Sequence, residues 1–241
     1  MTPEDLFKNA ERVAAIIDHT LLKPEATEDD VARLCREAAE FRFASVCVNP
    51  CWVPVAAATL NGSGVRVCTV VGFPLGANQT QIKITEAQRA ISDGAIELDI
   101  VQNIGALRSG NCRLVSEEIS QLAELAHGSG AILKVILETC LLTEEQKVES
   151  CRLAVDAGAD FVKTSTGFST GGATVEDVQL MRRTVGASIG VKASGGIRNL
   201  EALEAMVAAG ATRIGTSSGV AILREMTSGS SENVVAAKTQ Y

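Results

Sequence analysis

The stretch Phe161-Val162-Lys163-Thr164-Ser165-Thr166-Gly167-Phe168 begins as an apolar strand, carries a lysine within that strand, and ends in a turn of threonine, serine and glycine. An unpaired ammonium group inside a strand that is buried on both faces is costly, and such a group usually loses its proton instead. A neutral lysine amine is the nucleophile that imine formation with an aldehyde or ketone requires. We therefore take Lys163 as the candidate nucleophile.

Short apolar runs alternate with amphipathic stretches on both sides of this segment, along the whole chain. Eight strand–helix units account for a chain of 241 residues, which predicts a single α/β domain over residues 1–241, folded as a (β/α)8 TIM barrel. An open, doubly wound sheet is the alternative, and the presence of eight units makes it the weaker one. The predicted strands are Ala14–Asp18, Ala44–Val48, Val65–Val71, Ala95–Val101, Ala131–Leu137, Phe161–Thr166, Ser188–Ala193 and Arg213–Thr216.

The composition limits both the core and the kind of partner. Hydrophobic residues make up 46% of the chain but aromatic residues only 3%, so aliphatic side chains must fill the core. A formal net charge of −7 argues against a nucleic-acid partner, which would need a basic patch. The seven cysteines include no CxxC pair and the two histidines lie far apart, so we expect no metal and no cofactor. The absence of a signal peptide or a membrane-length apolar stretch predicts a cytoplasmic protein without a membrane partner.

Polar residues inside the predicted strands are candidates for an active site, because barrel enzymes place their chemistry at the carboxyl ends of the strands. Neighbouring strands carry Asp99, Lys134, Lys163 and Lys192, and we expect the three lysines at the same register. A single strand lysine is equally well explained by an edge position or a stem that reaches solvent. Three lysines would repel one another, so at least one should be neutral at pH 7, with Asp99 balancing the others.

Three loops rich in glycine and hydroxyl residues follow the last three predicted strands, at 166–172, 194–198 and 215–219. Their backbone N–H groups can approach an anion, and each loop enters a helix whose N-terminus favours negative charge. One such loop is weak evidence, since glycines also end helices and form turns. Three of them on the same side of a barrel predict a phosphate site.

Cys47 and His19 each end a predicted strand near the expected pocket. We interpret Cys47 as a small apolar filler rather than a nucleophile, because no histidine or acid is placed to make it a thiolate. His19 forms either a pocket wall or a structural histidine, and we favour the structural role.

Five motifs resemble the deoxyribose-phosphate aldolases, a family of class I aldolases, and the resemblance runs from about residue 12 to about residue 225. The resemblance implies a TIM barrel that reversibly cleaves 2-deoxy-D-ribose 5-phosphate to D-glyceraldehyde 3-phosphate and acetaldehyde through a lysine Schiff base, without metal. The motifs are Ile17–Pro24, Val71–Pro74, Glu97–Asp99, Phe161–Phe168 and Val191–Arg198.

The resemblance also implies roles for individual residues. Lys163 matches the Schiff-base lysine, and Lys192 matches a second lysine whose charge favours the neutral amine of the first. Asp99 matches the acid/base that moves protons through a water, and Lys134 matches a lysine that supports this relay. Gly171, Gly195, Gly196, Ser217 and Ser218 match phosphate contacts, and the further substrate contacts that we expect are Asp18, Thr20, Cys47, Thr166, Gly167, Ile197 and Gly215.

The only tyrosine of the protein, Tyr241, is its last residue. Some members of this family have a terminal tyrosine thought to assist proton transfer in the site, and we expect the same of Tyr241. A disordered tail is the alternative. We expect the tail to be flexible from near residue 228, because residues 229–232 resemble a linker.

Two other functions stay open at this point. One is another Schiff-base barrel, of the transaldolase or fructose-bisphosphate type. The other is a catalytically silent barrel that senses sugar phosphates. The partners that we expect are a small sugar phosphate, an aldehyde, and further copies of the chain in a dimer or tetramer.

Overall fold

The computed structural model describes the backbone of residues 3–237 and the side chains of residues 5–228. Its eight strands form a closed parallel barrel, in which each strand pairs with the next one and β8 pairs with β1. The predicted TIM barrel is thus confirmed, and the open sheet is excluded. The strands are β1 (Ile17–Leu21), β2 (Ser45–Val48), β3 (Arg66–Val71), β4 (Glu97–Val101), β5 (Ile132–Ile136), β6 (Phe161–Lys163), β7 (Gly190–Ser194) and β8 (Arg213–Thr216).

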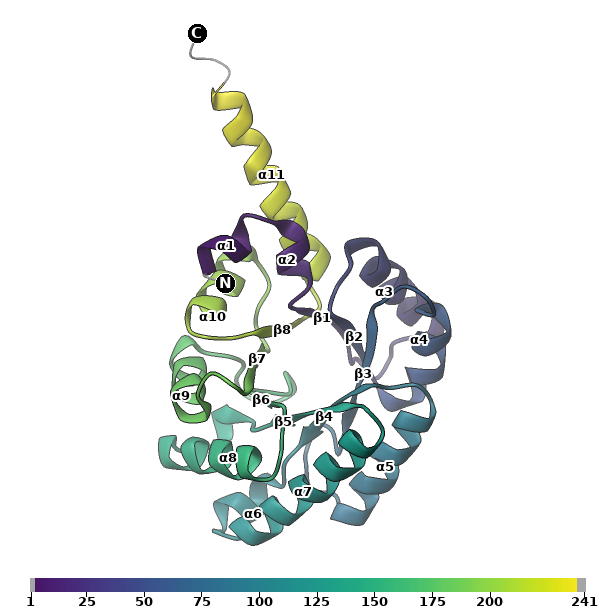
Figure 1. Ribbon diagram of the computed structural model, residues 1–241, viewed down its shortest axis with the longest axis vertical. Helices are drawn as coiled ribbons and strands as arrows, with labels where there is room; N and C mark the ends of the chain where they lie inside the picture. The colour runs from purple at the N-terminus through teal and green to yellow at the C-terminus, as the bar shows by residue number, and fades with distance from the viewer. Residues whose placement is uncertain (1–2, 238–241) are drawn as a thin grey trace.

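Helices surround the barrel, as Figure 1 shows. Thr27 and Thr143 begin two of them with the capping boxes typical of helix starts, in which side chain and backbone satisfy each other's hydrogen bonds. The helices between strands are α3 (Glu28–Phe41), η1 (Pro50–Trp52), α4 (Val53–Thr59), α5 (Thr80–Ser92), α6 (Ile104–Arg108), α7 (Cys112–Gly128), η2 (Thr139–Leu141), α8 (Glu144–Asp156), α9 (Val175–Val185) and α10 (Leu200–Ala208).

Aliphatic side chains fill the layer between the strands and the helices, as the composition predicts. Val46, Leu98, Leu133 and Val162 are all fully buried in this layer. Successive side chains of a strand point to opposite faces, so the residues that alternate with these four point into the barrel. This alternation carries the charged residues of the strands into the barrel interior.

The first strand differs from its prediction. Residues Ala10–Ala14 form a short helix, α2, whose first N–H groups donate to the side chain of Asn9, and β1 begins only at Ile17. The predicted start at Ala14 is therefore wrong, because one apolar run covers both the end of a helix and the start of a strand. The sixth strand is also shorter than predicted and ends at Lys163.

The chain begins with α1 (Pro3–Phe7) and α2 and ends with α11 (Gly219–Ala237). Helix α11 packs against α2 and then extends beyond the barrel (Figure 1). The backbone at 229–232, where we expected a flexible link, belongs to this helix. Tyr241 lies outside the described residues, so its expected role stays a prediction.

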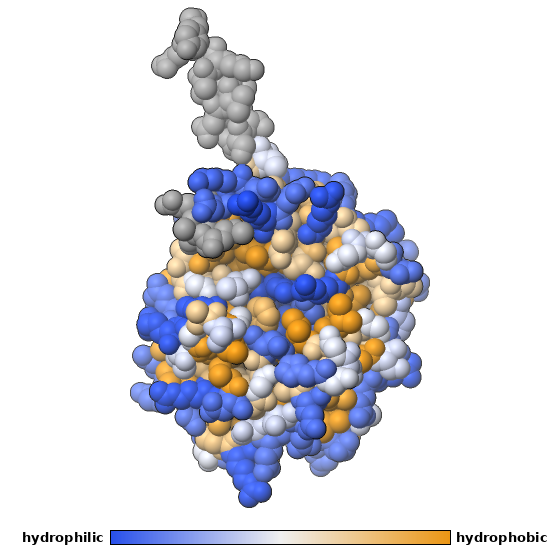
Figure 2. Space-filling view, viewed as in Figure 1, coloured by the Kyte–Doolittle hydropathy of each residue, from blue (hydrophilic) through white to orange (hydrophobic). Residues whose placement is uncertain are grey.

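The surface seen down the barrel is mixed in character. Figure 2 shows hydrophobic residues in small separate groups between hydrophilic ones, with strongly hydrophilic residues near the centre of this face. None of the helices in the described part of the chain is both long enough and apolar enough to span a membrane.

Candidate active site

Charged residues of the strands, most of them named in the sequence analysis, meet inside the barrel. Six strands contribute these residues, and each residue is at most 6% exposed. We call this group the charged cluster; it consists of Asp18, Glu97, Asp99, Lys134, Lys163, Lys192 and Arg213.

Asp99 lies at the centre of the three lysines. Its Oδ2 accepts hydrogen bonds from Lys163 Nζ and Lys192 Nζ, each at 2.7 Å, and its Oδ1 accepts one from Lys134 Nζ at 2.8 Å. Burial alone would raise the pKa of Asp99, but the nearby lysines, Lys134 first among them, outweigh it and hold the pKa well below its ordinary value. Asp99 is therefore a carboxylate in direct contact with all three amines.

The carboxylate partners distinguish the three lysines. Both Lys192 and Lys134 have a second carboxylate partner besides Asp99. Lys192 Nζ lies 2.5 Å from Asp18 Oδ2, and Lys134 Nζ lies 2.6 Å from Glu97 Oε2. Burial opposes the charge of both lysines, but these carboxylates raise the pKa of each above its ordinary value. Lys192 and Lys134 are therefore held as ammonium ions. Lys163 has one carboxylate partner among the described residues, Asp99.

The charge of the cluster does not balance when every member is ionised. It then holds four cations (three lysines and Arg213) against three carboxylates. An uncompensated charge in a buried site is costly, so the cluster favours the loss of one proton. Among the described residues, Lys163 is the lysine of the cluster with the fewest carboxylate partners. That one of the three lysines is neutral stays a prediction.

The register of the lysines differs from the predicted one. Lys163 pairs with Lys192 across β6 and β7, and Asp99 pairs with Lys134 across β4 and β5. Lys134 also pairs with Phe161, two residues before Lys163, so the expectation of one common register is wrong for Lys134. Its amine still reaches the site because Asp99 lies directly opposite it.

A pocket of about 230 Å³ opens at the carboxyl ends of the strands, and of the three lysines it is lined by Lys163 alone. The three glycine loops form much of its wall. Two exposed cations that we did not single out, Lys23 and Arg198, line it as well. The predicted site residues that line the pocket are Thr20, Lys163, Thr166, Gly167, Gly195, Gly196, Ile197, Gly215 and Ser217.

Four of the predicted substrate contacts do not line the pocket. Asp18 is fully buried against Lys192, and its Oδ1 accepts hydrogen bonds from Arg213 and Ser45. These ion pairs give Asp18 an electrostatic role rather than the expected contact role. The other three are Cys47, Gly171 and Ser218.

The loops are tied together by contacts that explain their glycines. A Cβ atom on Gly172 would overlap the backbone of Gly195, so only glycine lets these two loops approach each other. The N–H group of Thr166 donates to the buried carboxylate of Glu138, and that of Ser218 donates to Thr216 Oγ1. These two amides are therefore already hydrogen-bonded, whereas we expected the loop amides to face an anion.

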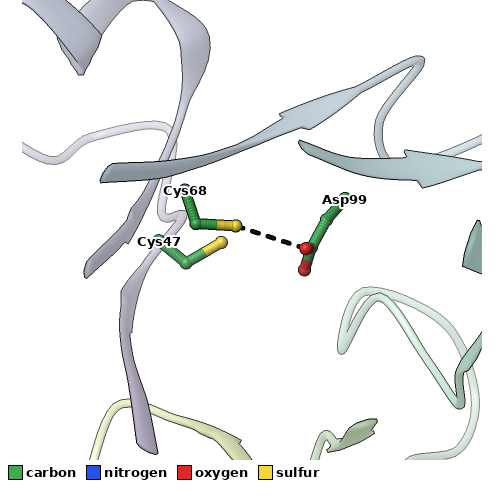
Figure 3. Close-up of side chains that lie close together, drawn as sticks. All are labelled: Cys47, Cys68 and Asp99. Carbon is green, nitrogen blue, oxygen red and sulfur yellow. Dashed lines mark hydrogen bonds between the residues drawn. The ribbon is translucent and has the colours of Figure 1, made fainter. Parts of the chain in front are cut away.

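Two thiols flank the charged cluster. Cys47 and Cys68 pair across β2 and β3, and Cys68 Sγ lies 3.2 Å from Asp99 Oδ1 (Figure 3). Burial raises the pKa of Cys68, whereas a hydrogen bond with Cys68 lowers the pKa of Cys47. Ligand atoms of Cys47, Cys68 and Asp99 lie within 4.8 Å of one another, a spacing that a metal ion can use. Because both Asp99 oxygens already bind ammonium groups, a metal cation there would meet three lysines, and we assign no metal site.

His19 lies on the outer side of β1. Its Nε2 lies 2.8 Å from Glu37 Oε2, and its ring packs against Phe43 with a centroid distance of 4.9 Å. It does not line the pocket around Lys163, which supports the structural role that we favoured.

Several residues of the site escaped the sequence analysis. Phe168 lines the pocket and meets Phe73 edge to face, with ring centroids 5.2 Å apart, so the loops after β3 and β6 touch at the mouth. Arg213 and Cys68 are buried beside the predicted acids and lysines. One signal for Arg213 was present, since a charged residue opens the last apolar run.

Comparison with known proteins agrees with this geometry. The family model described as "DeoC/LacD family aldolase" matches residues 12–229. The chain belongs to this aldolase family. Among its relatives, the deoxyribose-phosphate aldolase of Geobacillus sp. (strain WCH70) is 60% identical over 218 residues, covering 90% of this chain and 97% of the relative. That of Lysinibacillus sphaericus (strain C3-41) is 60% identical over 210 residues, covering 87% and 94%.

One solved structure is similar to this chain over nearly the whole length of both. It is described as a unique tetrameric structure of the deoxyribose phosphate aldolase from Aeropyrum pernix. Its TM-score is 0.88 at 38% identity, with 94% of this chain and 95% of that chain covered.

Proposed function

We propose that the protein is a deoxyribose-phosphate aldolase that reversibly cleaves 2-deoxy-D-ribose 5-phosphate to D-glyceraldehyde 3-phosphate and acetaldehyde through a Schiff base on Lys163. One observation carries the choice of nucleophile. Among the described residues, Lys163 faces the pocket and has one carboxylate partner, whereas Lys134 and Lys192 are each held by two close carboxylates away from the pocket. The substrate class comes from the family and from the loops at the pocket mouth.

The reaction begins with the neutral amine of Lys163. Its lone pair attacks the aldehyde carbon of the substrate and gives a carbinolamine, which loses water to form a protonated imine. Asp99, 2.7 Å from this amine, exchanges the protons of these steps through a water molecule. Lys192, on the same Asp99 oxygen, stays protonated and supports the charge balance of the site.

The protonated imine then accepts the electrons of the bond between the second and third carbons. The hydroxyl group on the third carbon gives its proton through water to Asp99, and the new carbonyl leaves as D-glyceraldehyde 3-phosphate. Protonation of the remaining enamine at its terminal carbon regenerates an imine, and water hydrolyses it to acetaldehyde and free Lys163. We propose that Tyr241, which lies outside the described residues, donates the proton to the terminal carbon of the enamine.

The phosphate group of the substrate lies at the pocket mouth in this proposal. Lys23 and Arg198 supply positive charge there, and α11 begins at Gly219, directly after the third loop, so the positive end of its dipole faces the same region. Binding at a phosphate remote from the reacting bond supplies orientation. The chemistry needs no metal or cofactor, and we further propose that the enzyme acts in the cytoplasm as a homo-oligomer.

The test is a product assay. Incubation with 2-deoxy-D-ribose 5-phosphate should release acetaldehyde and D-glyceraldehyde 3-phosphate in equal amounts, with no effect of a chelator. The variant Lys163→Arg should abolish release, whereas Lys147→Arg, on α8 outside the barrel, should not. Another Schiff-base aldolase would release no acetaldehyde, and a silent sugar-phosphate binder would gain thermal stability from the ligand without turning it over. Inactivation by the chelator would contradict the metal-free mechanism.

A further inference from the structure

The charged cluster continues below the reacting amines, away from the pocket. Arg213 Nη1 lies 2.6 Å from Asp18 Oδ1 and 3.1 Å from Glu97 Oε2, so it bridges the two lower carboxylates. Arg66 Nη1 lies 3.0 Å from the other oxygen of Glu97, and the side chain of Arg66 is 50% exposed. Arg213, Glu97 and Arg66 do not line the pocket, so they cannot touch the substrate there.

Arg213 creates the excess of positive charge in the cluster. Without it, the buried members of the cluster would be three lysines and three carboxylates, with no net charge; Arg66 adds a cation at Glu97, but its side chain is half-exposed and therefore screened by solvent. With Arg213 bound to Asp18 and Glu97, one cation is left over. Each of these two carboxylates also holds a lysine, Asp18 holding Lys192 and Glu97 holding Lys134. The excess charge therefore falls on the lysine that neither of them contacts, Lys163.

We propose that Arg213 is a positioning residue that keeps the amine of Lys163 neutral at working pH, by occupying the carboxylates that would otherwise balance a third ammonium group. Glu97 is its counterpart and favours the protonated amine. The inference rests on the proposed function, in which Lys163 is the Schiff-base lysine. It adds a long-range electrostatic device that acts through Asp18, Lys192 and Asp99 and not through the substrate.

The other groups that face Lys163 stay unchanged when Arg213 is replaced. Each barrel strand other than β6 and β8 brings one of them to the site, and two of them are thiols. In strand order they are Asp18, Cys47, Cys68, Asp99, Lys134 and Lys192.

The experiment measures the pH at which Lys163 becomes reactive. Each variant is treated with acetaldehyde and cyanoborohydride over a range of pH, and the initial rate of ethylation at Lys163 is followed by peptide mass. Arg213→Met should move the midpoint of this profile upward by about one pH unit, the size expected for loss of one buried charge. Glu97→Gln should move it downward, and Arg213→Lys, which keeps the charge, should restore the midpoint of the natural protein.

A matched pair of surface variants provides the control. Arg42 and Glu11 form an ion pair at 3.1 Å with side chains 74% and 71% exposed, so Arg42→Met and Glu11→Gln make the same chemical changes without burial. They should leave the midpoint in place. Lower rates at every pH with unchanged midpoints in Arg213→Met and Glu97→Gln would show a merely structural role and overturn the inference.

If Arg213→Met and Glu97→Gln do not fold, Arg66→Met removes a half-exposed cation that contacts Glu97, and the midpoint should still rise, by a few tenths of a pH unit; no rise would overturn the inference. If the natural protein is not ethylated at Lys163, the proposed function itself fails. Ethylation at Lys163 with coincident midpoints in all variants would refute only the role of Arg213.

Discussion

Replacing Lys192 by methionine removes the ammonium group that shares Asp99 Oδ2 with Lys163. The two lysine nitrogens each lie 2.7 Å from this oxygen, which places them no more than about 5.4 Å apart. At that distance and an effective dielectric constant of about 20, two positive charges repel each other by about 3 kcal/mol. Loss of this repulsion shifts Lys163 from amine toward ammonium by roughly a hundredfold.

The expected result for Lys192→Met is a fall of about a hundredfold in kcat/KM at neutral pH, with partial recovery as the pH rises. Acetaldehyde release measured over a range of pH gives both quantities. Lys192→Arg keeps the positive charge. The pH at which activity falls on the acid side of the pH–rate profile (the acid limb) should therefore stay in place, even where the different shape of arginine lowers the rate. An acid limb that stays in place in Lys192→Met, or activity within about twofold of the natural protein at neutral pH, would refute the argument.

Three other changes test separate parts of the site. Gly215→Ala places a Cβ atom 3.0 Å from the Cε of Lys192, and overpacking of this kind should lower stability by about 1–3 kcal/mol in chemical unfolding and reduce activity as well. Arg198→Met should raise KM for the phosphorylated sugar by about tenfold with little change in kcat, and should leave cleavage of unphosphorylated deoxyribose unaffected; an equal effect on both sugars would remove Arg198 from the phosphate site. Folding lowers the pKa of Asp18 and Asp99, so the unfolded chain binds more protons as the pH drops below about 4, and the free energy of unfolding should fall toward the folded-state pKa values. Asp18→Asn should reduce the pH dependence of the free energy of unfolding, measured by urea titration in acid. An unchanged dependence on pH would contradict the contribution of Asp18.

The barrel is predictable from sequence because its strands and helices keep separate periodicities. Strand residues such as Val135 and Val162 alternate with charged ones, and a lysine flanked by fully buried aliphatics has to point into the barrel. That argument locates Lys134, Lys163 and Lys192 without coordinates. It fails at the first strand, where one apolar run contains both the end of α2 and the start of β1.

The vertical order of the charges is not predictable in the same way. A strand pattern tells which face a residue points to but not its height in the barrel, and so Asp18 was expected at the substrate although it is buried against Lys192 and does not line the pocket. The pairing of Lys134 with Phe161 depends on the stagger between strands, which no single strand encodes. For the same reason the bridge that Arg213 forms between Asp18 and Glu97 becomes visible only once the barrel is closed.

The central claim is that Lys163, and no other lysine of the charged cluster, forms a Schiff base with the substrate. The direct measurement is borohydride reduction in the presence of 2-deoxy-D-ribose 5-phosphate, followed by peptide mapping of all modified lysines. The structure predicts a reduced adduct on the peptide that contains Lys163, at the base of the pocket, with Lys134 and Lys192 unmodified. An adduct on Lys192 or Lys134 instead, or turnover without any trapped lysine, would contradict the account.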